Sequence, residues 1–323
     1  MKPVFFLVLI LLVAACQDKK EEQAETSHKV VVAPIDNTPS LVVLGTIQDA
    51  GSPHIGCKKE CCKDLFEHPD PLRKVVSLGI VDPENDKTYL FEATPDISTQ
   101  VKKLGNFTNG NSELPDGIFL THAHIGHYTG LMYLGKEAAN SNNIPVYTMP
   151  RMKTFLETNG PWSQLVEQHN ISIKVMAAQM GVKLTSNLEV VPMLVPHRDE
   201  FSETVGYKIK GPNKTALFIP DIDKWSKWET DISEFLSEVD YAFLDATFFD
   251  GDEINSRDIS EIPHPFIIES MEEFRTLNSE EKKKIYFIHF NHTNAVINPD
   301  SRAYQQVIDN GFNVARIHQI LPL

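Results

Sequence analysis

Basic side chains are scarce in this sequence of 323 residues, in which 30 lysines and arginines stand against 44 aspartates and glutamates. The formal charge of -14 argues against a polyanion as the natural partner, because nucleic-acid binders usually carry a clustered basic face. The sequence also has no evident internal repeat. We therefore predict a small-molecule substrate and no nucleic-acid partner.

A hydrophobic run long enough to span a bilayer is also missing at the N-terminus, where the apolar stretch covers only residues 4–13. Lys2 precedes this stretch and small residues before Cys16 follow it, as in a targeting segment of residues 1–16. The segment resembles the lipobox of bacterial lipoproteins, in which the cysteine becomes the lipid-modified N-terminus; an ordinary secretory signal is the alternative. Residues 17–40 are polar and poor in aromatics, which predicts a flexible linker. We expect an exported protein that Cys16 anchors to a bacterial membrane, on its periplasmic or cell-surface side.

Cysteine is the third scarcity, with only four in the chain. If Cys16 is lipidated, the remaining Cys57, Cys61 and Cys62 form an odd set, and odd sets fit disulfides badly. A zinc ion held by the three thiolates and one histidine resolves this count without oxidising any pair. One disulfide with a free thiol is the alternative.

Three closely spaced histidines are the clearest chemical signal in the sequence. The apolar run 118–120 predicts a buried strand, and residues 128–138 have the apolar spacing of a helix. His122, His124 and His127 lie between the two, at the carboxyl end of the predicted strand, where open α/β layers place ligands. We predict a metal site there, with a solvated histidine-rich loop as the alternative.

Apolar runs elsewhere predict the rest of an α/β domain. Short β-rich runs predict strands at 41–46, 75–81, 88–93, 145–149, 171–176, 188–195, 206–209, 216–219, 239–244, 285–288 and 314–320. Helical spacing is present at 152–158, 162–169 and 303–309, and Asp96 is a candidate N-cap for a helix starting at residue 97.

Residues 121–130 resemble the His-x-His-x-Asp-His signature of the metallo-β-lactamase fold hydrolases. The order of segments over residues 41–323 most resembles the coenzyme PQQ synthesis protein B family, notably at 94–97, 245–248 and 289–297. The resemblance implies one domain, residues 41–323, with an αββα sandwich in which two sheets face each other with helices outside. Loops at one edge of that sandwich carry the metals.

The resemblance also implies the ligands of two catalytic metals, with Asp221 as the bridging carboxylate and Asp223 as the second choice. Its histidine ligands are His122, His124 and His197 for the first metal, and His127 and His289 for the second. Gly126 occupies the position of the family's aspartate, so we expect a weakened second site, about one tightly held catalytic metal, and tighter binding after Gly126→Asp. Asp49 and Asp96 are the nearest residues that could replace the missing aspartate.

Two further sets are implied by the phosphodiesterase branch of the resembled fold. Asp245 and His264 resemble its acid and histidine pair, in which the imidazole donates a proton to the leaving oxygen. His292 resembles a histidine that joins three cysteines on a structural zinc in the cyclic-phosphate phosphodiesterase of the carbon-phosphorus lyase pathway. This residue supplies the missing fourth ligand for Cys57, Cys61 and Cys62.

We therefore predict a metal-dependent hydrolase of a phosphodiester or another small ester, with zinc as the expected metal and iron or manganese as alternatives at the catalytic site. A metal-activated water would attack, held by Asp221. Two other classes of function remain open. One is an oxidative enzyme that uses iron, like the PQQ synthesis protein B family, and the other is a non-catalytic binding lipoprotein, which Gly126 favours.

Overall fold

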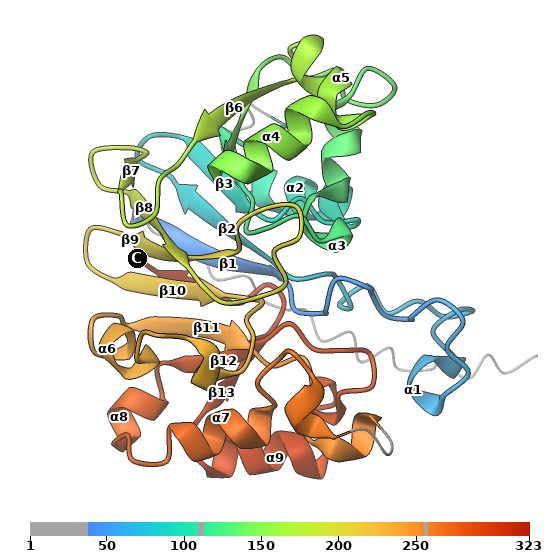
Figure 1. Ribbon diagram of the computed structural model, residues 1–323, viewed down its shortest axis with the longest axis vertical. Helices are drawn as coiled ribbons and strands as arrows, with labels where there is room; N and C mark the ends of the chain where they lie inside the picture. The colour runs from blue at the N-terminus through green and yellow to red at the C-terminus, as the bar shows by residue number, and fades with distance from the viewer. Residues whose placement is uncertain (1–37, 109–112, 255–257) are drawn as a thin grey trace, which may run out of the picture. The chain divides into compact units, whose positions relative to one another are not determined.

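The computed structural model describes residues 38–108, 113–254 and 258–323 (Figure 1). The predicted targeting segment with Cys16, and the predicted linker up to residue 37, lie outside these ranges. Among the described residues, no helix is both long and apolar enough to cross a membrane.

Within the described residues, two mixed sheets of seven strands each form the centre of the domain. In spatial order, the first sheet contains β14 (Ile320–Pro322), β1 (Ser40–Gly45), β2 (Ser77–Asp82), β3 (Lys87–Phe91), β4 (Gly117–Phe119), β5 (Ile144–Thr148) and β6 (Ile171–Val175). The second contains β13 (Asn313–Val314), β12 (Ile285–Ile288), β11 (Tyr241–Asp245), β10 (Thr215–Ile219), β9 (Val205–Lys210), β8 (Glu189–Leu194) and β7 (Val182–Lys183).

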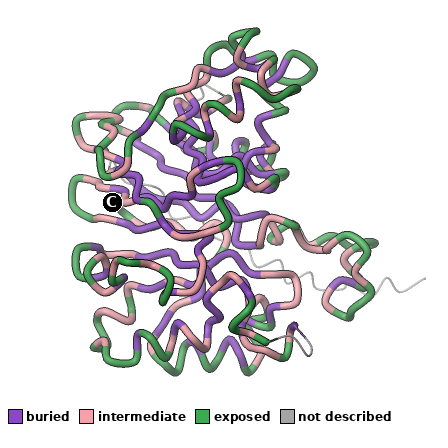
Figure 2. The backbone as a smooth tube through the Cα atoms, in the orientation of Figure 1, coloured by how far each residue is buried: buried purple, intermediate pink, exposed green. Residues whose placement is uncertain are grey.

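A buried apolar layer joins the faces of the two sheets. Phe91 and Phe119 from the first sheet stack at 5.0 Å between ring centroids, and Tyr207 from β9 meets both rings edge-on. The strands here read as continuous apolar runs because both faces are covered, as in the fully buried β1 and β2. Figure 2 shows this burial along the strands and exposure on the outer turns.

Helices cover the outer face of each sheet, which completes four layers (Figure 1). The α-helices are α1 (Glu60–Lys63), α2 (Ile97–Gly105), α3 (Ile125–Tyr128), α4 (Pro150–Thr158), α5 (Trp162–Glu167), α6 (Ile232–Ser237), α7 (Ile267–Glu273), α8 (Ser279–Lys282) and α9 (Arg302–Asp309). Short 3₁₀ turns are η1 (Thr129–Leu134), η2 (Trp225–Lys227), η3 (Gly251–Ile254), η4 (Ile259–Glu261) and η5 (Ala295–Ile297). The αββα sandwich is confirmed.

The helix predicted at 128–138 is wrong, because α3 ends at Tyr128 and the chain tightens into η1. Gly130 packs directly on the preceding loop: its N–H donates to the Ala93 carbonyl at 2.8 Å, and a Cβ there would lie 2.1 Å from the Thr94 carbonyl oxygen. These backbone contacts between distant segments override the local apolar spacing.

The single strand predicted at 314–320 is also wrong. Val314 ends β13 in the second sheet, and Ile320 begins β14 in the first. Between them His318 adopts a left-handed φ of 68°, and its N–H donates to the Val43 carbonyl at 2.7 Å. The segment therefore turns and crosses from one sheet to the other.

Asp96 occupies the N-cap position of α2, as predicted, but its carboxylate serves the neighbouring loop. It accepts hydrogen bonds from the Val75 N–H at 2.9 Å and from Lys74 Nζ at 3.1 Å.

Candidate metal centre

The carboxyl ends of strands from both sheets bring the predicted residues together. His122 follows β4, His197 follows β8, Asp221 follows β10, and His289 follows β12 directly. Strands β10, β11 and β12 are mutually parallel, so their carboxyl ends lie at one edge of the second sheet. A hydrogen bond from the Val205 N–H to the Thr121 carbonyl, 3.1 Å long, ties the end of β4 to that sheet.

Asp221 lies at the centre of this cluster and is buried. Its Oδ2 lies 3.4 Å from His122 Nε2 and 3.8 Å from His124 Nδ1, and its Oδ1 lies 3.2 Å from His197 Nε2. The ligand-type atoms of these four residues all lie within 4.8 Å of one another, which is a spacing that one metal ion can bridge. The structure thus assembles the residues predicted for the first metal.

A second group adjoins the first. His127 Nε2 lies 3.7 Å from Asp221 Oδ2, and His127, His289 and Asp49 bring one ligand-type atom each within 4.8 Å of one another. A carboxylate can bind one cation through each oxygen, so Asp221 is placed to serve both groups. Asp223, the second choice for the bridging carboxylate, contacts the opposite nitrogen of His197: its Oδ1 lies 3.2 Å from His197 Nδ1, on the side of the ring away from Asp221.

In four of these histidines, Nδ1 makes a hydrogen bond with a protein side chain, and Nε2 faces the cluster. His122 Nδ1 lies 2.8 Å from Thr121 Oγ1, and His289 Nδ1 lies 2.9 Å from Thr247 Oγ1. The Nε2 atoms of His122, His127, His197 and His289 are buried and have no hydrogen-bond partner within the part of the chain that the structure describes. Buried nitrogens without partners are costly unless something binds them, so this donor set fits a metal ion such as zinc.

Burial and neighbouring charges decide which of these histidines are protonated in the metal-free protein. Burial and the neighbouring His127 charge hold the pKa of His122 well below its ordinary value. Burial would also lower the pKa of His127, but the Glu92 carboxylate raises it to about 9. Burial would likewise lower the pKa of His197, but the Asp221 carboxylate raises it to about 9. These protons supply positive charge beside Asp221, and a bound divalent cation can supply the same charge.

The predicted acid and histidine pair is in contact. His264 Nδ1 lies 2.8 Å from Asp245 Oδ2 and 3.2 Å from Asp221 Oδ1. Asp245 is fixed by hydrogen bonds from the Ile222 N–H at 3.1 Å and the Thr247 N–H at 3.0 Å. The His264 side chain stays 13% exposed, unlike the fully buried His289, so its free edge is placed to meet a substrate. Burial would lower the pKa of His264, but the carboxylates of Asp245 and Asp221 raise it to about 10.

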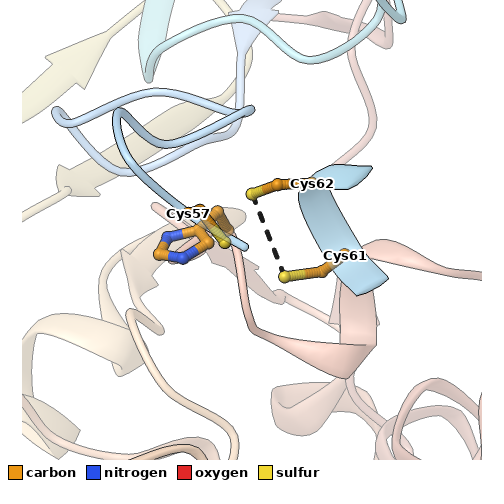
Figure 3. Close-up of side chains that lie close together, drawn as sticks. Cys57, Cys61 and Cys62 are labelled. Atoms are coloured by element: carbon orange, nitrogen blue, oxygen red, sulfur yellow. Dashed lines mark hydrogen bonds between the residues drawn. The ribbon is translucent and has the colours of Figure 1, made fainter. Parts of the chain in front are cut away.

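A separate cluster contains the three cysteines, which lie close together as free thiols (Figure 3). Cys61 Sγ and Cys62 Sγ are 4.0 Å apart, and one ligand-type atom from each cysteine and from His292 lies within 4.8 Å of the others. Burial and the nearby His54 lower the pKa of His292 to about 4, so this imidazole is neutral and able to bind a metal. The donor set fits a structural zinc, and Cys57, Cys61 and Cys62 are free thiols in this structure.

Two acidic residues were not assigned to the site from the sequence. Glu92 is fully buried, and its Oε2 lies 3.0 Å from His127 Nδ1. Glu92 lies within the strand predicted at 88–93, which indicated a structural position, and Asp96 beyond it was named as the possible metal ligand instead. Asp49, named only as a possible replacement for the missing aspartate, belongs to the second group.

Comparisons with known proteins agree with this geometry. A sequence profile described as the beta-lactamase superfamily domain matches residues 87–290. Coenzyme PQQ synthesis protein B from Methylococcus capsulatus is 23% identical over 301 residues, which cover 84% of this chain and 96% of that protein. The protein of the same name from Acinetobacter baumannii is 23% identical over 303 residues, which cover 85% of this chain and 97% of that protein.

Solved structures show the same fold. Zn(2+)-bound PqqB from Methylobacterium extorquens has a TM-score of 0.72 at 20% sequence identity, covering 88% of this chain and 100% of that chain. A diphosphatase from the PhnP family has a TM-score of 0.62 at 21% identity, covering 88% of this chain and 97% of that chain. Because the profile match spans more than half of the sequence and the domain is an αββα sandwich, this chain belongs to the beta-lactamase superfamily and has the metallo-β-lactamase fold.

Proposed function

We propose that this protein is a metal-dependent hydrolase of a phosphodiester or another small ester. The observation that carries the proposal is the pairing of His264 with Asp245 beside a cluster of buried imidazole nitrogens that face one carboxylate, Asp221. A cluster of that kind suits a metal that activates water, and a partly exposed, protonated histidine suits proton donation. The name of the PhnP-family neighbour, a diphosphatase, supports phosphate chemistry.

When bound, a zinc ion would polarise the substrate and lower the pKa of a water molecule from about 15.7 to about 7. The protein residues supply orientation and proton transfer. Asp221 is buried beside the imidazoles, and the charges of His197 and His264 outweigh its burial and hold its pKa well below the usual range, so it stays ionised to orient the nucleophile. Asp245 holds His264 Nδ1, which leaves Nε2 to donate a proton to the leaving oxygen.

A leaving-group comparison tests the proposed role of His264. A phosphodiester with an alkyl leaving group needs a proton donor, whereas a nitrophenyl ester releases a stable anion. We expect His264→Gln to lower kcat by about 10²–10⁴ for the alkyl ester and by much less for the nitrophenyl ester. His68→Gln, at an exposed histidine, is the matched control and should change neither rate.

Two results would contradict the proposal. An equal loss on both esters would remove His264 from proton donation. Failure of the wild type, loaded with zinc or manganese, to hydrolyse any member of a panel of phosphodiesters, phosphonate esters, lactones and β-lactams would refute the hydrolase itself.

A second candidate function is a step in cofactor synthesis, which the names of the curated relatives indicate for those proteins. The match over 84% of this chain favours it. An oxidative step would use iron at the same imidazoles. Iron in protein purified without added metal, together with no hydrolysis of the panel, would support this candidate; zinc with hydrolysis would exclude it.

We also propose, from the sequence alone, that Cys16 is lipidated and anchors the exported protein to a bacterial membrane. The residues on which this depends precede those that the structure describes. Mass spectrometry of the mature N-terminus provides the test. A mature chain that begins at an unmodified residue, or retains residues 1–15, would refute the anchor.

A further inference from the structure

Gly126 lies against the backbone and side chain of Asp49. A Cβ built on Gly126 would lie 2.3 Å from Asp49 Cβ, 2.6 Å from the Asp49 carbonyl oxygen and 2.8 Å from Asp49 Cα. No pair of non-bonded carbon atoms tolerates such a distance, so any side chain at position 126 competes with Asp49 for the same space. Conversely, the Asp49 side chain starts almost where a side chain from position 126 would start.

Hydrogen bonds fix the loop that carries Asp49. The Gln48 N–H donates to the Phe290 carbonyl at 2.8 Å, and the Phe290 N–H donates to the Thr46 carbonyl at 2.8 Å. Phe290 directly follows His289, so the loop is held beside a residue of the second group. The Gln48 side-chain amide also donates to Asp49 Oδ1. One oxygen of a carboxylate can accept such a bond while the other binds a cation.

The groups that Asp49 faces lack protein partners. His127 and His289 are fully buried, and each presents an Nε2 atom with no hydrogen-bond partner among residues 38–323 outside the two undescribed gaps. Asp49 is only half-buried, and it brings a carboxylate oxygen within 4.8 Å of ligand-type atoms on both histidines. Two imidazoles and one carboxylate form a common donor set for a divalent ion, which takes the place of any proton on the imidazoles.

We propose that Asp49 is a ligand of the second catalytic metal and that it replaces, from a different segment of the chain, the aspartate that Gly126 lacks. Gly126 is then the residue that makes room for this ligand, and its presence does not indicate a weakened site. The inference rests on the proposed metal-dependent function, which it deepens by completing the second metal site. It predicts two tightly bound catalytic metals in place of one.

If Asp49 replaces the missing aspartate, the expected effect of Gly126→Asp is reversed. In the wild-type background, the new side chain collides with Asp49 and should displace the loop at residues 48–51. Asp49→Gly should not rescue this substitution, because the carbonyl oxygen and Cα at position 49 are backbone atoms and would still lie 2.6 Å and 2.8 Å from the new Cβ.

Metal titration of the purified protein tests the proposed role of Asp49 without any substrate. We expect wild type to bind two metals at the catalytic cluster, and Asp49→Asn to lower the affinity of the second by at least about 100-fold, the upper end for loss of a supporting residue. The isosteric asparagine preserves the fold, which circular dichroism and the melting temperature check. Gly126→Asp should also lose the second metal, because its side chain displaces the loop that carries Asp49.

Asp96→Asn is the matched control, because Asp96 is the other sequence candidate for the missing aspartate, yet its carboxylate binds Lys74 and Val75. Its metal content should equal that of wild type. Unchanged second-site affinity in Asp49→Asn, or a wild type with one catalytic metal, would overturn the inference. These outcomes are separate from the test of function: wild-type protein that binds both metals and hydrolyses nothing would refute the hydrolase and leave the role of Asp49 intact.

Discussion

Glu92→Gln should weaken metal binding at His127 without altering any atom that touches the metal. Glu92 Oε1 accepts a hydrogen bond from the Thr121 N–H at 3.1 Å, and Oε2 lies 3.0 Å from His127 Nδ1. With a carboxylate at that position, His127 keeps its proton on Nδ1 and presents a lone pair at Nε2. A glutamine that retains the Thr121 bond turns its amide group toward Nδ1, which favours the opposite tautomer and places a proton where the metal should bind.

The size of the effect follows from the burial of this pair. Both side chains are fully buried, so water cannot replace the lost acceptor. Loss of such a supporting carboxylate typically costs 10- to 100-fold in metal affinity, or about 1.4–2.7 kcal/mol. Titration calorimetry with zinc should show this loss at the second metal, while the first metal, held by other histidines, binds as in wild type.

Asp82→Asn is the matched control. Asp82 is also a fully buried acid and accepts hydrogen bonds from Asn85, but it lies at the other end of the β2–β3 pair. It should cost stability without changing metal affinity. Glu92→Gln with wild-type affinity for both catalytic metals would refute the tautomer reasoning, and equal losses in the two variants would point to a general loss of stability.

Two further predictions concern metal content and pH. Cys62→Ser should release about one metal equivalent and leave the catalytic metals bound. It should lower the free energy of unfolding by more than about 4 kcal/mol, which corresponds to roughly 10 °C in melting temperature. A disulfide among the three cysteines of the native protein would contradict this prediction. Zinc affinity at the catalytic cluster should rise with pH and level off above about 9, because His127 and His197, with pKa values of about 9 in the metal-free protein, must lose protons to bind. Affinity that is flat between pH 6 and 9 would show that neither histidine is a ligand.

Local patterns predicted most of the fold. Buried strands such as β1 and β10 are continuous apolar runs, and the chemistry-bearing residues follow them directly, so both are visible in the sequence. The errors came where distant backbone contacts decided the conformation. The end of α3 depends on a carbonyl of Ala93, and the turn before β14 depends on a carbonyl of Val43.

The same division applies to the site. The histidine spacing of the 122–127 motif is local, whereas Glu92 acts on a residue 35 positions away. Asp49 reaches the cluster only because its loop bonds to Phe290, at the other end of the domain. Gly126 carried a usable signal, since a glycine where a carboxylate is expected can mean that another segment fills the space. The sequence left Asp49 and Asp96 as the two candidates, and the tertiary contacts are needed to distinguish between them.

The cysteine cluster has a consequence for the order of assembly. Cys57 and His292 lie about 235 positions apart in the chain, yet they meet in one cluster. A nascent chain carries its three thiols for nearly the whole of synthesis before the fourth donor exists, and His289, three residues earlier, arrives almost as late. Neither metal set has all of its donors until the chain beyond β12 has been made, so neither metal can be fully bound early in synthesis. A chain that crosses a membrane unfolded would acquire its metals on the far side.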